Sequence, residues 1–332
     1  MFTAAALVTA CTSSVPKLAL GRSANTAQNL QAQYEEVVRA VLPSVVQINA
    51  GDSTGSGVVY DTGGDIVTNA HVVGDAKTVQ VISAAGDPML TGKVIGTFRP
   101  DDLAVVRVAQ DAAKLKPARF ANSADAQPGE IVLAMGNPLG LTDSVTQGII
   151  SATGRTVSEP SGGAALITAA IQTSAAINPG NSGGALVNLA DEVVGIPTLA
   201  ARLPDEGGAA PGIGFAIPSD TVMNIADQLI RNGKVTNSGR ASLNIAAQTA
   251  ANPSGEPIGV AVEAVAPGGS AAQAGLRPGD VIVGINSEST PTVESLEGKL
   301  AEFKPGDKIT IQFRSGGSAQ QSTETKLGSL GG

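Results

Sequence analysis

The sequence predicts a mainly β fold, arranged as a barrel or a sandwich. Short runs of β-branched and aliphatic residues recur between turns rich in glycine and aspartate, and the 332 residues include 41 glycines and 19 prolines. Hydrophobic residues make up 42% of the chain and aromatic residues only 2%, so we expect a core of Val, Ile, Leu and Ala. The length corresponds to about two domains.

The first part of the chain alternates expected strands with turns. Apolar residues at helical spacing predict a short helix from Tyr34 to Pro43. A Gly-Ser-Gly run at residues 55–57 lacks the lysine and the following helix of a phosphate loop, which favours a hairpin turn there. Strands are expected at residues 45–49, 57–60, 66–68, 78–83, 94–95, 103–108, 131–135, 145–150, 167–177 and 185–194.

A longer helix is predicted after these strands. It runs from Ser219, its expected cap, to about Asn232, and Gly233 ends it. Residues 155–165 and 199–211 show no periodicity and are expected to be loops, which either regulate activity or are plain surface loops.

Composition excludes several functions. The net charge of −8 without a basic patch argues against nucleic acid as a partner. No apolar run reaches the roughly 18 residues that a membrane-spanning helix needs. One histidine and one cysteine cannot form a conventional zinc site or an intrachain disulfide, so we expect no metal and no cofactor.

Three motifs carry candidate chemistry. Ser182 lies in a run of glycines between expected strands, an environment that suits either a nucleophile or a simple turn. His71, the only histidine, could serve as its base or be a buried core residue. Asp102 immediately precedes an apolar strand and is expected to turn inward and orient the imidazole, whereas Asp101 is expected to face water. The order His, Asp, Ser is that of chymotrypsin-type proteases.

The segments TNAHVV, DLAV, INPGNSGGAL and GIGFAIP resemble the HtrA (Deg) family of serine proteases, and the resemblance extends over roughly residues 36–325. It implies a chymotrypsin-like double β-barrel protease domain followed by a PDZ domain. By this resemblance His71 is the general base, Asp102 its orienter and Ser182 the nucleophile. The backbone N–H groups of Gly180 and Ser182 would form the oxyanion hole.

The resemblance also implies a substrate-binding strand. Ile213, Gly214, Phe215 and Ala216 would hold the substrate as an added β-strand and line the specificity pocket. Many family members carry aspartate where this chain has Ser174, so no specificity is inferred from that position. Asn181 replaces the aspartate that pairs with a new N-terminus in trypsin-like zymogens, so activation by N-terminal cleavage is not expected.

After residue 240 the pattern changes. Strands are expected at residues 258–265, 281–285 and 308–313, with short helices at residues 270–274 and from Thr292, and a polar tail. The run GLRPGDVIVGIN resembles a PDZ domain, which binds peptide C-termini. The matching carboxylate loop is Ser242, Leu243, Asn244 and Ile245. Asn244 stands where the family has glycine, and asparagine tolerates positive φ.

The expected division of the chain starts with a lipoprotein signal segment at residues 1–11. In this segment Val8 to Cys11 loosely fit a lipidation box at Cys11, and the alternative is a disordered, Ala-rich terminus. A flexible tether at residues 12–35, a protease domain at 36–235 and a PDZ domain at 240–325 complete it.

These expectations combine into an exported, ATP-independent serine endopeptidase of the bacterial cell envelope. It would degrade unfolded or damaged proteins, contact a membrane only through a lipid anchor, and form a homo-oligomer, a trimer by family resemblance. The alternative from another class is a PDZ-containing chaperone or scaffold with little protease activity. An esterase or lipase is disfavoured because the chain lacks G-x-S-x-G between a strand and a helix.

Overall fold

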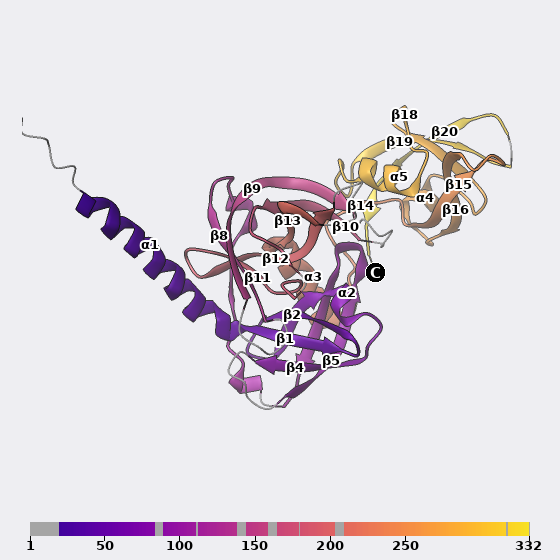
Figure 1. The fold of residues 1–332 in the computed structure, drawn as a ribbon. Helices are drawn as coiled ribbons and strands as arrows, with labels where there is room; N and C mark the ends of the chain where they lie inside the picture. Colours follow the sequence, from indigo (N-terminus) through magenta and orange to yellow (C-terminus); the bar gives the residue numbers. More distant parts are fainter. Residues whose placement is uncertain are drawn as a thin grey trace, which may run out of the picture.

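The described part of the protein consists of a closed six-stranded barrel, a seven-stranded sheet that closes into a second barrel, and a smaller C-terminal β unit. Figure 1 shows their arrangement. The computed structural model describes residues 20–83, 89–110, 112–137, 144–158, 165–178, 180–202, 209–316 and 318–331. The expected mainly β fold is confirmed.

The first barrel closes in the order β1-β2-β3-β6-β5-β4, and every pairing is antiparallel. Its interior contains the Val and Ile side chains that the composition led us to expect, among them Ile48, Ile66 and Val106. Its strands are β1 (Val45–Ala50), β2 (Ser53–Val59), β3 (Asp65–Asn69), β4 (Thr78–Ser83), β5 (Leu90–Phe98) and β6 (Leu103–Val108).

The Gly-Ser-Gly run at residues 55–57 is not a hairpin turn but lies inside β2. A Cβ at Gly57 would lie 2.7 Å from side-chain carbons of both Ile48 and Ile66, so glycine is needed at this crowded position of the barrel interior. The glycine content that suggested a turn therefore reflects close packing in a strand.

The second barrel follows the same plan. The sheet order is β11-β8-β9-β10-β13-β12-β7, and a β11–β12 pairing closes it. The single strand expected at residues 185–194 is a hairpin, because Asp191 adopts a left-handed turn conformation between β11 and β12. The strands are β7 (Arg119–Phe120), β8 (Ile131–Gly136), β9 (Ser144–Ser158), β10 (Leu166–Thr173), β11 (Ala185–Asn188), β12 (Glu192–Arg202) and β13 (Ala209–Pro218).

Helix α3 (Ser219–Asn232) follows the second barrel and packs against β5 and β6 of the first barrel and β12 of the second. It ends at Gly233 in a left-handed conformation, as expected. Ser219 does not cap it, because Pro218 holds the cap position and the Ser219 hydroxyl donates to the carbonyl of Ala121 at 2.7 Å. The serine therefore ties the helix to the barrel.

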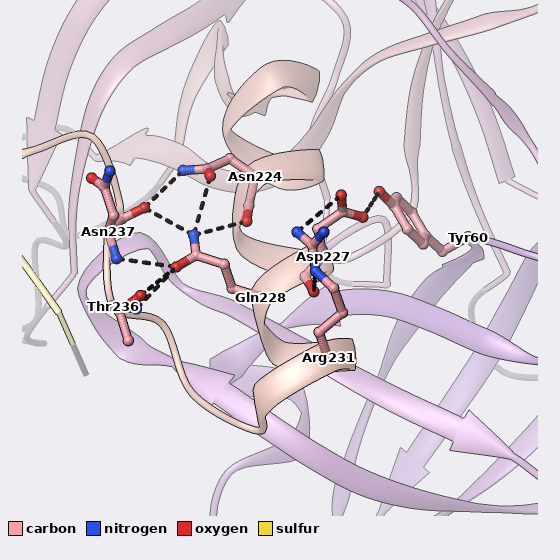
Figure 2. A network of polar contacts seen from close by, with 7 residues as sticks. All are labelled: Tyr60, Asn224, Asp227, Gln228, Arg231, Thr236 and Asn237. Carbon is pink, nitrogen blue, oxygen red and sulfur yellow. Dashed lines mark hydrogen bonds and ion pairs between the residues drawn. The ribbon is translucent and has the colours of Figure 1, made fainter.

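Polar contacts of the α3 residues Asp227 and Gln228 are shown in Figure 2. Gln228 accepts from the backbone N–H groups of Thr236 and Asn237 and donates to the Asn237 carbonyl at 2.8 Å, which fixes the chain just after the helix. Tyr60, from the first barrel, donates to Asp227 at 2.8 Å, and its burial and this carboxylate raise the pKa of the Tyr60 phenol. The phenol thus remains a hydrogen-bond donor that links the first barrel to α3.

Helix α1 (Leu20–Val41) is much longer than the short helix predicted from Tyr34, and residues 20–35 of the expected tether are helical. Val37 and Val41 are buried against the barrel core, while the earlier turns project away from the body (Figure 1). No proline interrupts residues 20–41, and Ala, Gln, Leu and Glu favour helix, which explains the extension.

The C-terminal unit is a sheet in the order β15-β16-β17-β19-β20, with β18 beside β17 and two short helices. The capping box at Thr292 confirms the predicted start of its main helix. The expected polar tail is wrong, since residues 321–326 form β20. The elements are β14 (Ala241–Ser242), β15 (Ile245–Ala251), β16 (Pro257–Val265), α4 (Ser270–Gln273), β17 (Val281–Ile285), β18 (Glu288–Ser289), α5 (Val293–Leu300), β19 (Lys308–Arg314), β20 (Gln321–Lys326) and β21 (Gly328–Ser329).

The last residues return to the junction with the barrels. Strand β21 pairs with β14, and the carbonyl of Leu330 accepts from the backbone and the hydroxyl of Ser238. The Leu330 side chain packs against the barrel core. The remaining elements are the helix α2 (Ala70–Val73) and the 3-10 turns η1 (Leu42–Ser44), η2 (Arg99–Asp101), η3 (Ala112–Lys114) and η4 (Ser123–Asp125).

Candidate active site

His71 lies in α2, the single helical turn that follows β3. The turn is held by Asp102, whose carbonyl accepts from Ala70 N and from the Asn69 side chain, each at 3.0 Å. The imidazole side chain is 40% exposed, so His71 is not a buried core residue. The only histidine of the sequence therefore faces an accessible surface.

The carboxylate of Asp102 has donors on both oxygens. Oδ1 accepts from the backbone N–H of His71 at 2.9 Å, and Oδ2 accepts from Nδ1 of its ring at 2.7 Å. Asp102 is turned inward, as expected, by a left-handed backbone with φ of 50°, an unfavourable conformation for most non-glycine residues. This backbone aims the carboxylate at the imidazole and fixes the side of the ring that carries the proton.

Thr198, on β12, connects Asp102 to Ser182. Its hydroxyl donates to Oδ2 of Asp102, and its carbonyl accepts from Oγ of Ser182 at 3.4 Å. The structure thus brings His71, Asp102 and Ser182 together at the junction of the two barrels. Sequence reasoning missed Thr198, since nothing in the sequence distinguishes it from other strand threonines.

The loop that carries Ser182 is fastened to the first barrel by Ser56. The Ser56 N–H donates to the Ser182 carbonyl at 2.9 Å, and its hydroxyl donates to the Gly180 carbonyl at 2.5 Å. The same hydroxyl accepts from Asn137 N at 2.9 Å, and the Ser56 carbonyl accepts from Thr68. Ser56 is completely buried, so this serine of the Gly-Ser-Gly run positions the loop rather than forming a turn.

Glycines around Ser182 serve close packing. A Cβ at Gly183 would meet the Ser56 carbonyl and the Thr68 hydroxyl, and one at Gly184 would meet the Met135 carbonyl. Gly180 has φ of 107°, in the region that favours glycine. Within the described residues, the N–H groups of Gly180 and Ser182 make no hydrogen bond, which leaves two donors available beside the Ser182 hydroxyl.

The expected substrate strand needs correction. Gly214, Phe215 and Ala216 on β13 are paired with β10 on one side and β12 on the other, so they have no free edge for an added strand. Strand β12 pairs with β11 only as far as Gly195, and its next residues pair only with β13. The Pro197 carbonyl accepts from Gly183 N at 3.0 Å, so the free edge beside Ser182 belongs to residues 198–200. Ile213 is exposed in the middle of β13.

Asp101 does not face water, contrary to expectation. It is 2% exposed and accepts at Oδ1 from Arg240 Nη1 at 2.8 Å. Arg240 also donates to the Pro100 carbonyl at 3.0 Å. Burial raises the pKa of the Asp101 carboxyl, and Arg240 opposes that shift. An ion pair between the barrels and the C-terminal unit thus lies next to Asp102 in the chain.

Two further positions support the loop. The Ser174 hydroxyl accepts from the backbone N–H of Ile149 at 3.0 Å and so has a structural role. Asn181 donates to the Ala176 carbonyl at 3.3 Å and is buried. The loops around residues 159–164 and 203–208, and Cys11, lie outside the described residues.

The candidate carboxylate loop lies at the start of β15. Asn244 has φ of 57°, as its predicted tolerance of positive φ allows, and its amide donates to the Ser329 carbonyl at 2.9 Å. The Ser242 hydroxyl accepts from Asn244 N at 2.9 Å. These contacts hold the loop Ser242–Ile245 at one end of a cavity of about 270 Å³ between β15 and α5.

Two antiparallel barrels with histidine, aspartate and serine side chains gathered at their junction define the class of trypsin-like serine proteases. Comparisons with known proteins agree. A trypsin-like peptidase domain matches residues 55–196, and a PDZ domain matches residues 261–314. Serine endoprotease DegS of Salmonella typhimurium is 37% identical over 298 residues, which cover 84% of this chain and 82% of the relative. The chain belongs to the HtrA family of serine proteases with a PDZ domain.

Other relatives and solved structures fit this assignment. Serine protease Do-like HtrA of Lactobacillus helveticus is 39% identical over 80% of this chain, and putative serine protease HhoB of Synechocystis sp. is 40% identical over 80%. The chain spans 66% and 64% of the lengths of these two relatives, about two thirds. A crystal structure of a serine endoprotease from Yersinia pestis has a TM-score of 0.59 and 34% identity, over 90% of this chain and 98% of that one.

Proposed function

We propose that the protein is a serine endopeptidase in which Ser182 is the nucleophile, His71 the general base and Asp102 the group that orients it. Ser182 Oγ leaves the Thr198 carbonyl and attacks a peptide carbonyl while His71 accepts its proton. The carbonyl oxygen becomes an oxyanion, which the N–H groups of Gly180 and Ser182 stabilise. The amine leaves with a proton from His71, and water then hydrolyses the acyl-enzyme.

The observation that carries this proposal is the arrangement around Asp102. Its Oδ2 accepts from His71 Nδ1 at 2.7 Å and from Thr198, which in turn accepts from Ser182. A carboxylate in this position fixes the tautomer whose other ring nitrogen can accept a proton, and it stabilises the imidazolium that forms. The exposure of His71 leaves room for a substrate beside it.

Digestion of β-casein by the wild type and by Ser182→Ala tests the mechanism. We expect the variant to lose about 10⁴-fold or more of the activity, because nucleophile and base act as one unit. A fluorophosphonate probe should label the wild type at Ser182 and leave the variant unlabelled. Near-wild-type cleavage by a folded Ser182→Ala protein would remove Ser182 from the mechanism.

The substrates we propose are unfolded or damaged polypeptides, with small apolar residues at the cleavage position. A substrate strand would add to residues 198–200 of β12, the free edge beside Ser182. Prevention of aggregation without cleavage by the wild type would instead favour a PDZ-containing chaperone or scaffold.

We infer that the PDZ domain binds peptide C-termini, with the carboxylate at Ser242–Ile245. The solved HtrA-type protease AlgW, 30% identical with a TM-score of 0.59, was determined with a decapeptide, which supports a peptide site in this chain. We place the protease domain at residues 36–235 and the PDZ domain at 240–325. A fragment prepared to test this should extend to residue 331, because β21 and Leu330 contact the unit.

We also propose export to the bacterial cell envelope, lipidation at Cys11 and a homo-oligomer, as the family resemblance and the Val8–Cys11 sequence suggest. None of the helices in the described ranges is long and apolar enough to cross a bilayer. Mass spectrometry of the mature protein checks the anchor: an unmodified Met1, or a cut elsewhere, would exclude it. Light scattering or ultracentrifugation measures the oligomeric state.

A further inference from the structure

The groove between β15 and α5 is lined by both apolar and charged side chains. Two ionisable side chains, Arg240 and Glu297, line it together with apolar ones. The apolar lining includes Leu243, Ile245, Val293, Leu296, Leu300 and Phe303.

Contacts between the strand and the helix give the groove a direction. The Thr249 hydroxyl accepts from the backbone N–H of Val293 at 3.1 Å, so the start of α5 lies beside the later part of β15. The end of α5, at Leu300, therefore lies toward the loop Ser242–Ile245, where β15 begins. A peptide that adds to β15 with its carboxylate at this loop places its last side chain near Leu300 and its earlier residues near Val293.

Strand geometry then assigns the neighbours of Glu297. Side chains of an extended peptide alternate, so the last and the third-from-last face the same side, here α5. Val293 and Glu297 are four residues apart and share one face of the helix, and both line the groove. Glu297 thus lies beside the third-from-last side chain of a bound peptide, and the last side chain lies near Leu300.

The two charged side chains that line the groove differ in their hydrogen bonding. Arg240 already donates to Asp101 and to the Pro100 carbonyl. The Glu297 carbonyl accepts from Ala301 N at 2.9 Å, but the Glu297 carboxylate forms no hydrogen bond or ion pair with the described residues. Burial raises the pKa of the Glu297 carboxyl, an effect that Arg240 opposes and Glu294 reinforces. A half-buried carboxylate that no hydrogen bond satisfies favours a cation in direct contact with it.

We propose that Glu297 selects polypeptide C-termini that carry Lys or Arg at the third position from the end and an apolar residue at the end. The proposal rests on the proposed binding of a peptide carboxylate at Ser242–Ile245. It names the class of polypeptide that the PDZ domain recognises, and it makes Glu297 the residue that determines specificity.

Fluorescence anisotropy on the full chain carrying Ser182→Ala measures this without cleavage. The probes are labelled peptides that end in Xaa-Ala-Val, with Lys, Gln or Glu at Xaa. We expect the Lys peptide to bind about 5- to 10-fold more tightly than the Gln peptide, and the Glu peptide to bind most weakly. Glu297→Gln should abolish the difference, and Glu297→Lys should reverse the order. Glu294→Gln, an exposed change on the same helix, should keep it.

The same peptides with an amidated C-terminus separate the two proposals. Equal binding of acid and amide peptides, or no binding of any acid peptide, would overturn the carboxylate loop and the Glu297 proposal with it. A second outcome would overturn the Glu297 proposal alone. Acid peptides would bind better than amides, but Lys would give no advantage, or its advantage would survive in a folded Glu297→Gln protein. The groove would then bind C-termini without Glu297 determining specificity. Thermal unfolding of each variant verifies the fold.

Discussion

The hydroxyl of Thr198 donates to Oδ2 of Asp102, the same oxygen that accepts from the imidazole of His71. The Thr198 carbonyl in turn accepts from the Ser182 hydroxyl. One strand residue therefore contacts both the group proposed to orient the base and the proposed nucleophile. Because Thr198 is buried, water cannot readily replace its hydroxyl.

Replacing Thr198 with valine removes the donor while keeping the shape of the side chain. A hydrogen bond to a charged group contributes about 1.5–3 kcal/mol, so we expect kcat/KM to fall by about 10- to 100-fold. Steady-state kinetics on a peptide substrate measure the change. Thr198→Ser retains the hydroxyl and should remain within about 3-fold of wild type. Wild-type kinetics for the valine variant would show that Asp102 does not depend on this bond.

Ser56→Ala leaves the Gly180 carbonyl and Asn137 N without their buried partner. Since Gly180 supplies one proposed oxyanion donor, we expect kcat to fall by about 10- to 100-fold with KM little changed, less than the loss of the donor itself would cost. Ser219→Ala is the matched control, because it removes a buried serine-to-carbonyl bond at α3, away from the loop. Equal effects of the two variants on kcat would leave Ser56 with only a structural role.

The ion pair of Arg240 and Asp101 predicts a pH-dependent stability. Arg240→Ala leaves a buried carboxylate without its cation, which costs about 3–5 kcal/mol at neutral pH. Burial already raises the pKa of Asp101, and losing Arg240 raises it further. A carboxyl whose pKa is higher in the folded than in the unfolded state lowers the free energy of unfolding as pH rises through the folded-state pKa. This loss of stability vanishes below the unfolded-state pKa. Urea unfolding should therefore show a smaller loss in acid than at neutral pH.

Two variants make that measurement specific. Adding Asp101→Asn to Arg240→Ala removes the buried charge and should recover part of the stability. Arg99→Ala breaks an exposed pair with Asp75 at the same turn and should cost less than about 1 kcal/mol. A loss for Arg240→Ala that is equal at both pH values would contradict the role of the Asp101 charge.

His71 provides a direct view of the proposed base, because it is the only histidine in the sequence. A protonated imidazole cannot accept the Ser182 proton, so kcat/KM should fall in acid in parallel with the single imidazole titration seen by NMR. Modification of one imidazole per chain should silence the enzyme, and a bound peptide aldehyde should protect it. Full activity of His71→Ala would exclude this residue as the base.

Local chemistry predicted much of the fold. Runs of Val and Ile located β1, β4 and β6, and the helix signals at Thr292 and Gly233 were confirmed. Strands β15 and β20 were missed because IAAQTAA and QSTETK contain few large apolar residues; their pairings with β16 and β19 hold them in place. Such pairings join segments that the sequence alone does not relate.

In the candidate site, too, local signals were predicted and contacts between distant segments were not. The position of Asp102 next to an apolar strand correctly predicted that its side chain turns inward. The burial of Asp101 was not predicted, because its partner Arg240 lies 139 positions away in the sequence. Ser56 contacts the Ser182 loop across a similar separation of 124 positions. The substrate edge was misplaced because pairing on both sides of β13 emerges only in the closed barrel.

Strands β14 and β21 bring the entry and the exit of the PDZ unit to one point beside the barrels. If a polypeptide is gripped in the groove while another part of it is held at Ser182, tension between the two sites acts on this junction. The Ser238–Leu330 bonds and the bonds of Arg240 to Asp101 and Pro100 hold this junction, while the β14–β21 pairing keeps the two ends of the unit together. We expect these contacts to break at a lower force than either barrel. The PDZ unit would then detach from the barrels under tension before the protease domain unfolds.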